Sequence, residues 1–328
     1  MSNLARKHFD RGVAHGKAGR HQEAIEDFRE ALRIKPDFVE ACFNLAISYR
    51  DFGDNEAAIE AFEEAIRIDP KYAESYCEIS LVYDDIGRKQ ESIESLREGI
   101  KAVSDKEDLS WMYYLLGVTY GGYGQWKEMI EALKQSDSID SVLSRDIHVH
   151  INWHLGIAYN ELGLWQKAVE VLQEVIRTGP HEYNAFYGLA KAYSQLGLYD
   201  EEMEICRQGI RNDSQNYWAY LGLGCAYGRQ GDDHKEIEAY KEAIRISPDF
   251  APAHHALGLS CTRIGRYQEA IEAFKQCIRI NPDHVEAHLN LGIAYSAIED
   301  KKAALQQYKI LKSLDIEQAN KLFNWIYK

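Results

Sequence analysis

The sequence contains little proline and cysteine and no long apolar segment. Its 328 residues include six prolines and six cysteines, and no two cysteines show CxxC spacing. The absence of that spacing excludes a zinc knuckle and gives no disulfide framework, so we expect the cysteines to be small core residues. No apolar run reaches about 18 residues and the opening segment is polar, which excludes a spanning helix and a secretory signal. We therefore expect a cytoplasmic protein that does not insert into a membrane.

Basic residues are scarce as well. Lysine and arginine number 38 against 52 acidic residues, which gives a formal net charge of −14. A surface that binds nucleic acid must neutralise phosphates, so this balance argues against nucleic acid as a partner. The sequence also has no P-loop, no GxSxG elbow and no HExxH pair. We accordingly expect neither catalysis nor a cofactor.

An internal period of 34 residues organises nearly the whole chain. Nine segments align at this period: 5–38, 39–72, 73–106, 110–143, 149–182, 183–216, 217–250, 251–284 and 285–318. The insertions between segments are 107–109 and 144–148. Such a period is typical of repeat architectures rather than of separate globular domains.

Two columns of small residues support the alignment. The first holds Gly12, Ala46, Ser80, Gly117, Gly156, Ala190, Gly224, Gly258 and Gly292. We expect this column where two helix backbones approach closely. The second holds Gly19, Gly53, Gly87, Gly124, Gly163, Gly197, Gly231 and Gly265, with Glu299 as the exception. We expect it to close the first helix of each unit at positive φ, and a later proline column to end the second helix.

The repeat resembles the tetratricopeptide repeat, with its aromatic, Leu-Gly, Tyr, Ala, Phe and Pro positions. Segment 39–72 carries the pattern at Leu45, Ala46, Tyr49, Ala58, Phe62, Ala65 and Pro70. The resemblance implies an all-α fold, namely a right-handed superhelix (α-solenoid) of nine helix-turn-helix repeats. A lone helix pair cannot bury its apolar face, whereas stacked neighbours can.

Segment 110–143 is irregular. Met129 and Ser136 stand where alanine is expected, and the terminal proline is missing. The insertions on either side allow two interpretations. They lengthen the first helices, which would begin near Asp108 and Ser144, or they form a hinge between an N-terminal and a C-terminal arm.

The last residues, 316–328, are predicted to form a capping helix. Its apolar stripe consists of Ile316, Ala319, Leu322, Phe323 and Ile326. Such a stripe fits the extra helix that closes many repeat arrays. Trp325 and Tyr327 fall outside the stripe, so they either cover the cap or form a self-association patch.

The sequence contains one group of histidines that is a candidate metal site and another that is a candidate part of the core. The metal candidates are His148, His150 and His154. The last two have helical i, i+4 spacing, but no cysteine or acidic fourth ligand stands at matching spacing, although Asp146 lies close in sequence. We expect a polar helical face there and no metal. His254 and His288 occupy a column that other repeats fill with Tyr76, Tyr113, Phe186 and Tyr220, and we expect them to pack in the core.

The resemblance also implies a binding surface, because the first helices of such repeats line a concave groove. The residues that map to it are Phe9, Phe43, Asn44, Glu74, Glu78, Trp111, Tyr114, Trp153, His154, Tyr187, Gly188, Lys191, Trp218, Gly222 and His255. Residues 39–106 contain 16 acidic and 8 basic residues, so we expect the N-terminal part to suit a basic segment. Further along, large aromatic side chains flank glycines at equivalent positions of consecutive repeats. We expect these aromatics to form a trough for a peptide with apolar anchors, or else only to fill the inner curve of the superhelix.

One functional pattern of the family is missing. Of the clamp that grips a chaperone's terminal carboxylate, only Asn44 is present. The sequence therefore predicts a non-catalytic scaffold or adaptor that binds a peptide or protein segment, with Trp153, Tyr187 and Trp218 as the main anchors. The alternative is a structural protein that assembles with its own copies through its end repeats.

Overall fold

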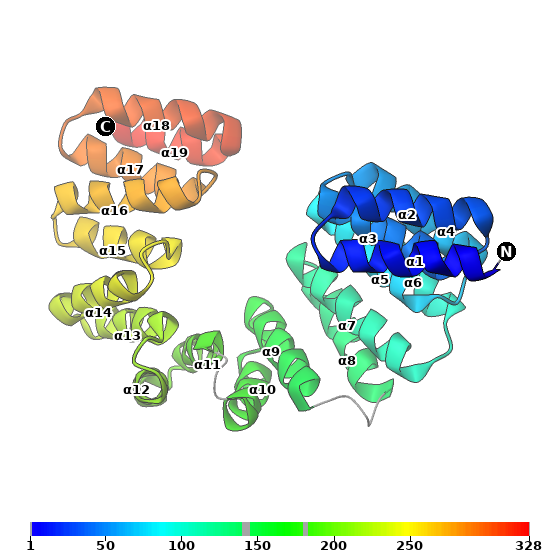
Figure 1. Cartoon of the computed structure of the whole chain (residues 1–328). Helices are drawn as coiled ribbons and strands as arrows, with labels where there is room; N and C mark the ends of the chain where they lie inside the picture. Colours follow the sequence, from blue (N-terminus) through cyan, green and yellow to red (C-terminus); the bar gives the residue numbers. More distant parts are fainter. Residues whose placement is uncertain (1, 140–144, 180–182, 328) are drawn as a thin grey trace. The chain divides into compact units, whose positions relative to one another are not determined.

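The computed structural model describes residues 2–139, 145–179 and 183–327, and every regular element in these ranges is an α-helix. The chain divides into two compact units, Met1–Leu162 and Gly163–Lys328. Within each unit every helix packs against the next one along the chain. Figure 1 shows these successive helix pairs. The predicted all-α repeat fold is confirmed.

The first unit contains helices α1 (Ser2–Lys17), α2 (His21–Ile34), α3 (Val39–Phe52), α4 (Asn55–Ile68), α5 (Ala73–Asp85), α6 (Lys89–Ala102), α7 (Lys106–Gly122), α8 (Trp126–Ile139) and α9 (Arg145–Glu161). The second contains α10 (Trp165–Thr178), α11 (Tyr183–Gln195), α12 (Tyr199–Asn212), α13 (Tyr217–Gln230), α14 (Asp233–Ile246), α15 (Ala251–Arg263), α16 (Tyr267–Ile280), α17 (Val285–Ala297), α18 (Lys301–Leu314) and α19 (Ile316–Ile326). No helix among the described residues is long and apolar enough to cross a bilayer.

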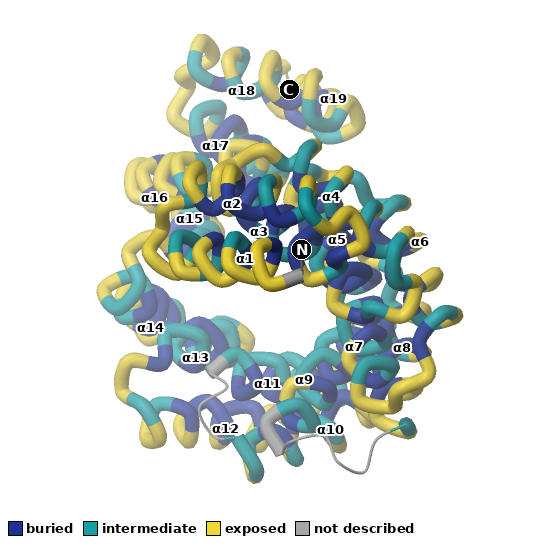
Figure 2. Tube along the Cα trace, turned by 45° about the vertical axis from the view of Figure 1, so that its right-hand side comes forward, coloured by how far each residue is buried: buried dark blue, intermediate teal, exposed yellow. Residues whose placement is uncertain are grey.

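Helix α4 shows how the repeat sequence forms its second helix. The side chain of Asp54 caps the N-terminus by accepting a hydrogen bond from the backbone N–H of Ala57, at 3.2 Å. The buried residues are Ala58, Ile59, Phe62 and Ala65, which fall on one face at helical spacing. The helix ends two residues before Pro70. Figure 2 shows buried stretches of this kind where the helices of each unit face one another.

The second small-residue column has the predicted backbone conformation. All eight glycines have positive φ, and Glu299 adopts the same conformation, with φ of 61°. Among described residues it is the only non-glycine with positive φ. A side chain at positive φ is strained, because its Cβ crowds the backbone.

We therefore expect Glu299→Gly to raise the free energy of unfolding by about 0.5 to 1 kcal/mol, measured by urea denaturation. The matched control is Lys309→Gly, at an exposed position inside α18 of the same repeat. There glycine removes helix propensity without relieving strain, so stability should fall by about 0.5 to 1 kcal/mol. Equal effects of the two substitutions would contradict the strain argument.

The first small-residue column serves a different contact from the one predicted. A Cβ placed on Gly258 would lie 2.5 Å from Cε1 of Phe274, and one on Gly12 would lie 2.7 Å from Cε1 of Phe28. Both rings belong to the second helix of the same repeat. The column therefore makes room for a large side chain rather than for a neighbouring helix backbone, because that side chain inserts between the helices.

The irregular region forms longer first helices. Helix α7 has 17 residues and begins at Lys106, where Asp105 accepts hydrogen bonds from the N–H groups of Glu107 and Asp108. Helix α9 also has 17 residues, and Ser144 before it lies outside the described residues. The longer-helix interpretation is thus confirmed. The boundary between the compact units lies after Leu162, outside the 107–148 region in which a hinge was considered.

The capping helix is present, but its buried face differs from the predicted stripe. Ala319, Leu322 and Ile326 are buried, whereas Ile316 is 56% and Phe323 is 42% exposed. The stripe prediction is wrong for these last two residues, because only one narrow side of α19 faces α17 and α18. The cysteines match their prediction: five are buried and Cys225 is half-buried.

Candidate binding surfaces on the first helices

Four of the predicted groove residues form a continuous aromatic run across α7 and α9 of the first unit. The ring of Trp111 stacks on that of Tyr114, with centroids 5.2 Å apart and an interplanar angle of 28°. Tyr114 contacts His154 at 5.8 Å, and His154 contacts Trp153 at 4.5 Å. We call these four residues the aromatic run.

Exposure differs sharply along the aromatic run. Trp111 is 42% exposed, while the other three members are half-buried. Burial lowers the pKa of His154 to about 4, with a smaller contribution from His150. The imidazole is therefore neutral at pH 7. The run thus presents an uncharged aromatic surface with one projecting indole ring.

The metal interpretation of the nearby histidines gains no support from the geometry. The Nδ1 atom of His148 lies 2.9 Å from a carboxylate oxygen of Asp137. Among the residues described, no group of three or more His, Cys, Asp or Glu side chains is placed to hold a metal ion. The side chain of Asp146 lies outside the described residues.

The acidic part of the predicted groove is partly neutralised. Glu78 on α5 forms an ion pair with Arg50 on α3, whereas Glu74 is exposed. The side-chain amide of Asn44 donates a hydrogen bond to the backbone oxygen of Glu40 at 2.7 Å, within its own helix. Of the three polar residues predicted here, only Glu74 therefore presents an exposed charge.

Phe9 does not belong to a surface groove, which corrects the prediction. It is 8% exposed and packs against Phe28 and Phe38, with ring centroids 5.7 and 5.0 Å away. Phe43 is half-buried against Phe62 and Tyr72, at 5.7 and 5.3 Å. Both side chains turn toward the core because aromatic residues of the neighbouring helices complete their packing.

In the second unit, Trp218 is surrounded by other aromatic rings. Its centroid lies 4.6 Å from Phe250, 5.2 Å from Tyr187 and 6.1 Å from Tyr217. The ring is half-buried and packs against a core cluster that includes Phe250. Trp218 and Tyr187 thus fill space between α11, α13 and the start of α15, as the alternative interpretation of these aromatics proposed.

The predicted glycine floor is a packing feature as well. Gly222 is buried, and a Cβ on it would lie 2.8 Å from the Sγ atom of Cys206. Tyr187, Lys191 and Gly222 line a cavity of only about 70 Å³, which is far smaller than a peptide site. Gly188 is half-buried nearby on α11. Tyr187, Lys191 and Gly222 therefore pack closely together, and a peptide trough over them stays a prediction.

The second group of histidines consists of packing residues. His254 and His288 are buried, and Nε2 of each lies 2.8 Å from a proline carbonyl oxygen, that of Pro248 and Pro282 respectively. His255 is half-buried, with its ring 4.8 Å from that of His284. Burial lowers the pKa of His255.

Three carboxylates that the sequence did not single out are buried, and two of them, Glu202 and Glu236, occupy the same column of consecutive repeats; the third, Asp27, pairs with Arg11. Glu202 is 1% exposed and Glu236 is 6% exposed, and each forms an ion pair with an arginine of the next repeat, Arg229 and Arg263. Ser260 also donates a hydrogen bond to Glu236 at 2.6 Å. The available signal was a column that holds alanine in most repeats, including Ala58 and Ala270, and glutamate in two consecutive ones.

Comparison with known proteins supports the fold. A family model for the tetratricopeptide repeat matches residues 9–73, 43–107 and 154–217, a second tetratricopeptide repeat model matches 219–250, and a TPR repeat model matches 258–298. No curated protein sequence matches the chain.

Several solved structures are similar. A tetratricopeptide repeat protein from Parabacteroides merdae is 14% identical with a TM-score of 0.56, covering 79% of this chain and 99% of its own. Yeast Tom70 is 12% identical with a TM-score of 0.51, covering 99% and 95%. YrrB, described as a TPR protein with an unusual peptide-binding site, is 20% identical with a TM-score of 0.46, covering 60% and 98%. The chain belongs to the tetratricopeptide repeat family, whose members are in general protein-interaction scaffolds.

Proposed function

We propose that the protein is an adaptor that holds a segment of a partner protein against the aromatic run of its first unit, with Trp111 as the main anchor. The observation that carries this proposal is the exposure of Trp111, 42%, on a ring that is already stacked on Tyr114. Large exposed aromatic residues are enriched among the side chains that dominate protein interfaces.

The rings that pack against Trp111 should increase its affinity for a partner, because they fix the indole ring before binding. Its stacking partner Tyr114 is held in turn by His154, whose Nε2 lies 3.5 Å from the tyrosine hydroxyl. A ring that is fixed before binding loses little conformational freedom when a partner covers it. The aromatic run is therefore preorganised, and apolar surface buried on Trp111 should contribute directly to binding.

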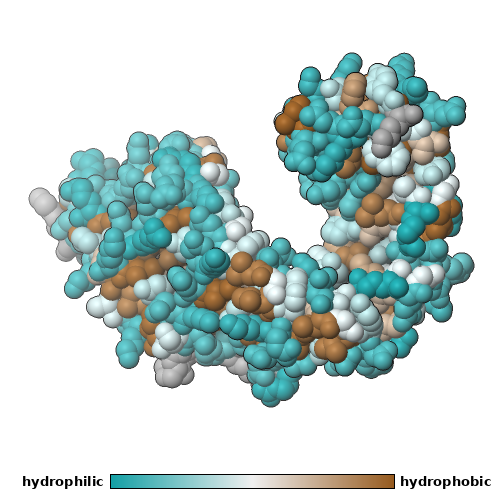
Figure 3. Space-filling view, turned by 180° about the vertical axis from the view of Figure 1, so that it is seen from behind, coloured by the Kyte–Doolittle hydropathy of each residue, from teal (hydrophilic) through white to brown (hydrophobic). Residues whose placement is uncertain are grey.

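The charge of the neighbouring repeats indicates the partner's character. Residues 39–106 carry 16 acidic and 8 basic residues, and Glu74 on α5 is exposed. Opposite charge speeds the encounter of two proteins and disfavours acidic competitors. The preferred segment therefore combines an apolar side chain for Trp111 with nearby lysine or arginine. Figure 3 shows apolar patches within polar surface on both units.

The test uses a random peptide library selected against the full chain. For the selected peptides, Trp111→Ala should raise the dissociation constant roughly 30-fold, which corresponds to about 2 kcal/mol. Fluorescence anisotropy measures this change. Trp325→Ala is the matched control, because Trp325 is 57% exposed but lies on α19 in the other unit. Equal losses in the two variants, or none in Trp111→Ala, would refute the proposal.

Self-assembly is the second candidate function, and the end of the array provides an observation for it. Ile316, Phe323 and Tyr327 of the C-terminal segment are 56%, 42% and 60% exposed. An exposed apolar stripe on the last helix is a surface that another helix would cover in a continuing array. Light scattering after size-exclusion over a concentration series separates the two functions. A mass that grows with concentration favours assembly, and a constant mass favours the adaptor.

A further inference from the structure

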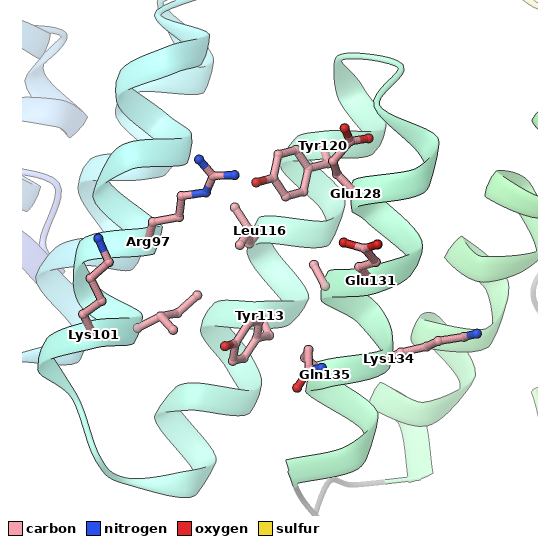
Figure 4. Close-up of a pocket in the computed structure, with 11 residues that line it drawn as sticks. Arg97, Lys101, Tyr113, Leu116, Tyr120, Glu128, Glu131, Lys134 and Gln135 are labelled. Carbon is pink, nitrogen blue, oxygen red and sulfur yellow. The ribbon is translucent and has the colours of Figure 1, made fainter.

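A larger cavity lies on the opposite side of α7 from the aromatic run. Its volume is about 660 Å³, and it is bounded by α6 and α8 with α7 as its floor. Tyr113, Leu116 and Tyr120 line it at i, i+3 and i+7, which is one face of α7, whereas Trp111 and Tyr114 project from the other. Figure 4 shows the three floor residues between the two flanking helices.

The floor of this cavity is apolar. Leu116 and Tyr120 are each 5% exposed, and Tyr113 is half-buried. The walls add apolar surface through Ile100 of α6 and Ala132 of α8. Helical rise places Tyr113 and Tyr120 roughly 10 Å apart along α7, or about two turns. The cavity is thus long enough for two turns of a helix lying between α6 and α8.

Its two walls carry opposite charges. The α8 wall includes Lys134 but has a net negative charge. The charged side chains that give the walls opposite signs are Arg97 and Lys101 from α6, and Glu128 and Glu131 from α8. In the part of the chain that the structure describes, none of these four side chains forms an ion pair, although Arg97 lies over the Tyr120 ring at 5.9 Å. By contrast, Arg67 and Arg245 pair with a glutamate of their own helix. The charges of the cavity are available to a ligand.

The equivalent groove one repeat earlier has a different charge pattern. Between α4 and α6 a cavity of about 220 Å³ is lined by Glu63 on one wall and by Glu91, Glu94 and Glu98 on the other. Both of its walls are acidic. The groove between α6 and α8 therefore differs from its predecessor in pairing a basic wall with an acidic one, and we call it the mixed-charge groove.

We propose that the mixed-charge groove binds an amphipathic α-helix of a partner protein, one with an apolar stripe flanked by an acidic edge and a basic edge. The stripe lies on Leu116 and Tyr113, the acidic edge faces Arg97 and Lys101, and the basic edge faces Glu128. This is a helix-in-groove mode in which charge sets the direction of the bound helix. It is a second site, independent of the aromatic run.

The opposite charges of the two walls determine which control peptide can test the mixed-charge groove. Turning a bound helix end for end exchanges its two edges, so a peptide with exchanged edges still binds, in the opposite direction. A meaningful control peptide therefore has the same composition with both charges mixed along both edges. The probe is a stapled helical peptide of roughly fourteen residues, with leucines in the stripe, glutamates on one edge and lysines on the other.

We expect the segregated peptide to bind the full chain about tenfold more tightly than the mixed peptide, by fluorescence anisotropy. Arg97→Glu with Lys101→Glu should remove this preference. Adding Glu128→Lys and Glu131→Lys exchanges the walls and should restore it. Lys127→Glu is the matched control, because Lys127 is an exposed lysine of α8 that does not line the cavity, and its replacement should leave affinity unchanged.

Photo-cross-linking from the N-terminal end of the peptide locates and orients it. The cross-link should fall near one end of the groove in the native chain, close to either Glu128 or Gln135, and should move to the other end in the fourfold variant. Equal affinity of the two peptides, failure of the fourfold variant to restore binding, or cross-links to Trp111 or Trp153 would each overturn the proposal. Because all substituted side chains are exposed, melting of each variant should match that of the native chain.

Discussion

Replacing Arg263 by methionine should lower the free energy of unfolding by about 2 to 3 kcal/mol. The carboxylate of Glu236 is 6% exposed, and Arg263 provides its cation from the next repeat. Removing one partner of a buried ion pair leaves a charge without compensation, and this costs far more than losing an exposed pair. Ser260 and Tyr240 still reach the carboxylate, at 2.6 and 3.5 Å, which keeps the loss at the lower end of the usual range. Urea denaturation followed by circular dichroism measures the change.

A second substitution should reverse the effect. Adding Glu236→Ala to Arg263→Met removes the carboxylate that has lost its cation. Alanine is also the residue that most repeats have at the position equivalent to Glu236, as at Ala270. The double variant should therefore be more stable than Arg263→Met alone. The control is Arg266→Met, because Arg266 and Glu269 are an exposed pair and should contribute less than about 1 kcal/mol. If the second substitution destabilises the chain further, the carboxylate is not the source of the loss.

Trp218→Ala should also lower the free energy of unfolding by about 2 to 3 kcal/mol, and should leave the affinity of the folded protein for selected peptides nearly unchanged. The ring is half-buried among Tyr187, Tyr217 and Phe250, so its removal opens a cavity beside the core. Trp325→Ala, at an exposed tryptophan, should change stability by less than about 0.5 kcal/mol. Denaturation and anisotropy on the same variants separate stability from binding. Weakened binding with native stability would return Trp218 to the role of anchor that the sequence predicted.

Features of the fold that depend on local geometry could be predicted from the amino-acid sequence. A glycine that recurs once per repeat predicts a left-handed residue at the end of each first helix, and the structure has positive φ at all eight glycines and at Glu299. The tetratricopeptide pattern likewise includes Ala58, Phe62 and Ala65, and all three are buried on one face of α4. These features repeat because a few neighbouring residues fix each of them, so a regular sequence gives a regular backbone.

The exposure of individual side chains and the pairing of charges depend on contacts between repeats and became visible only in the structure. Trp111 and Trp218 both map to the groove, yet Trp111 is exposed and Trp218 packs beside a core. The ion pairs Arg50–Glu78 and Arg263–Glu236 join residues 28 and 27 positions apart in sequence. The position of a residue within its repeat determines only the direction in which its side chain points from the helix. Its burial depends on the size and charge of whatever the adjacent repeats place opposite it, and the period of the sequence does not contain that information.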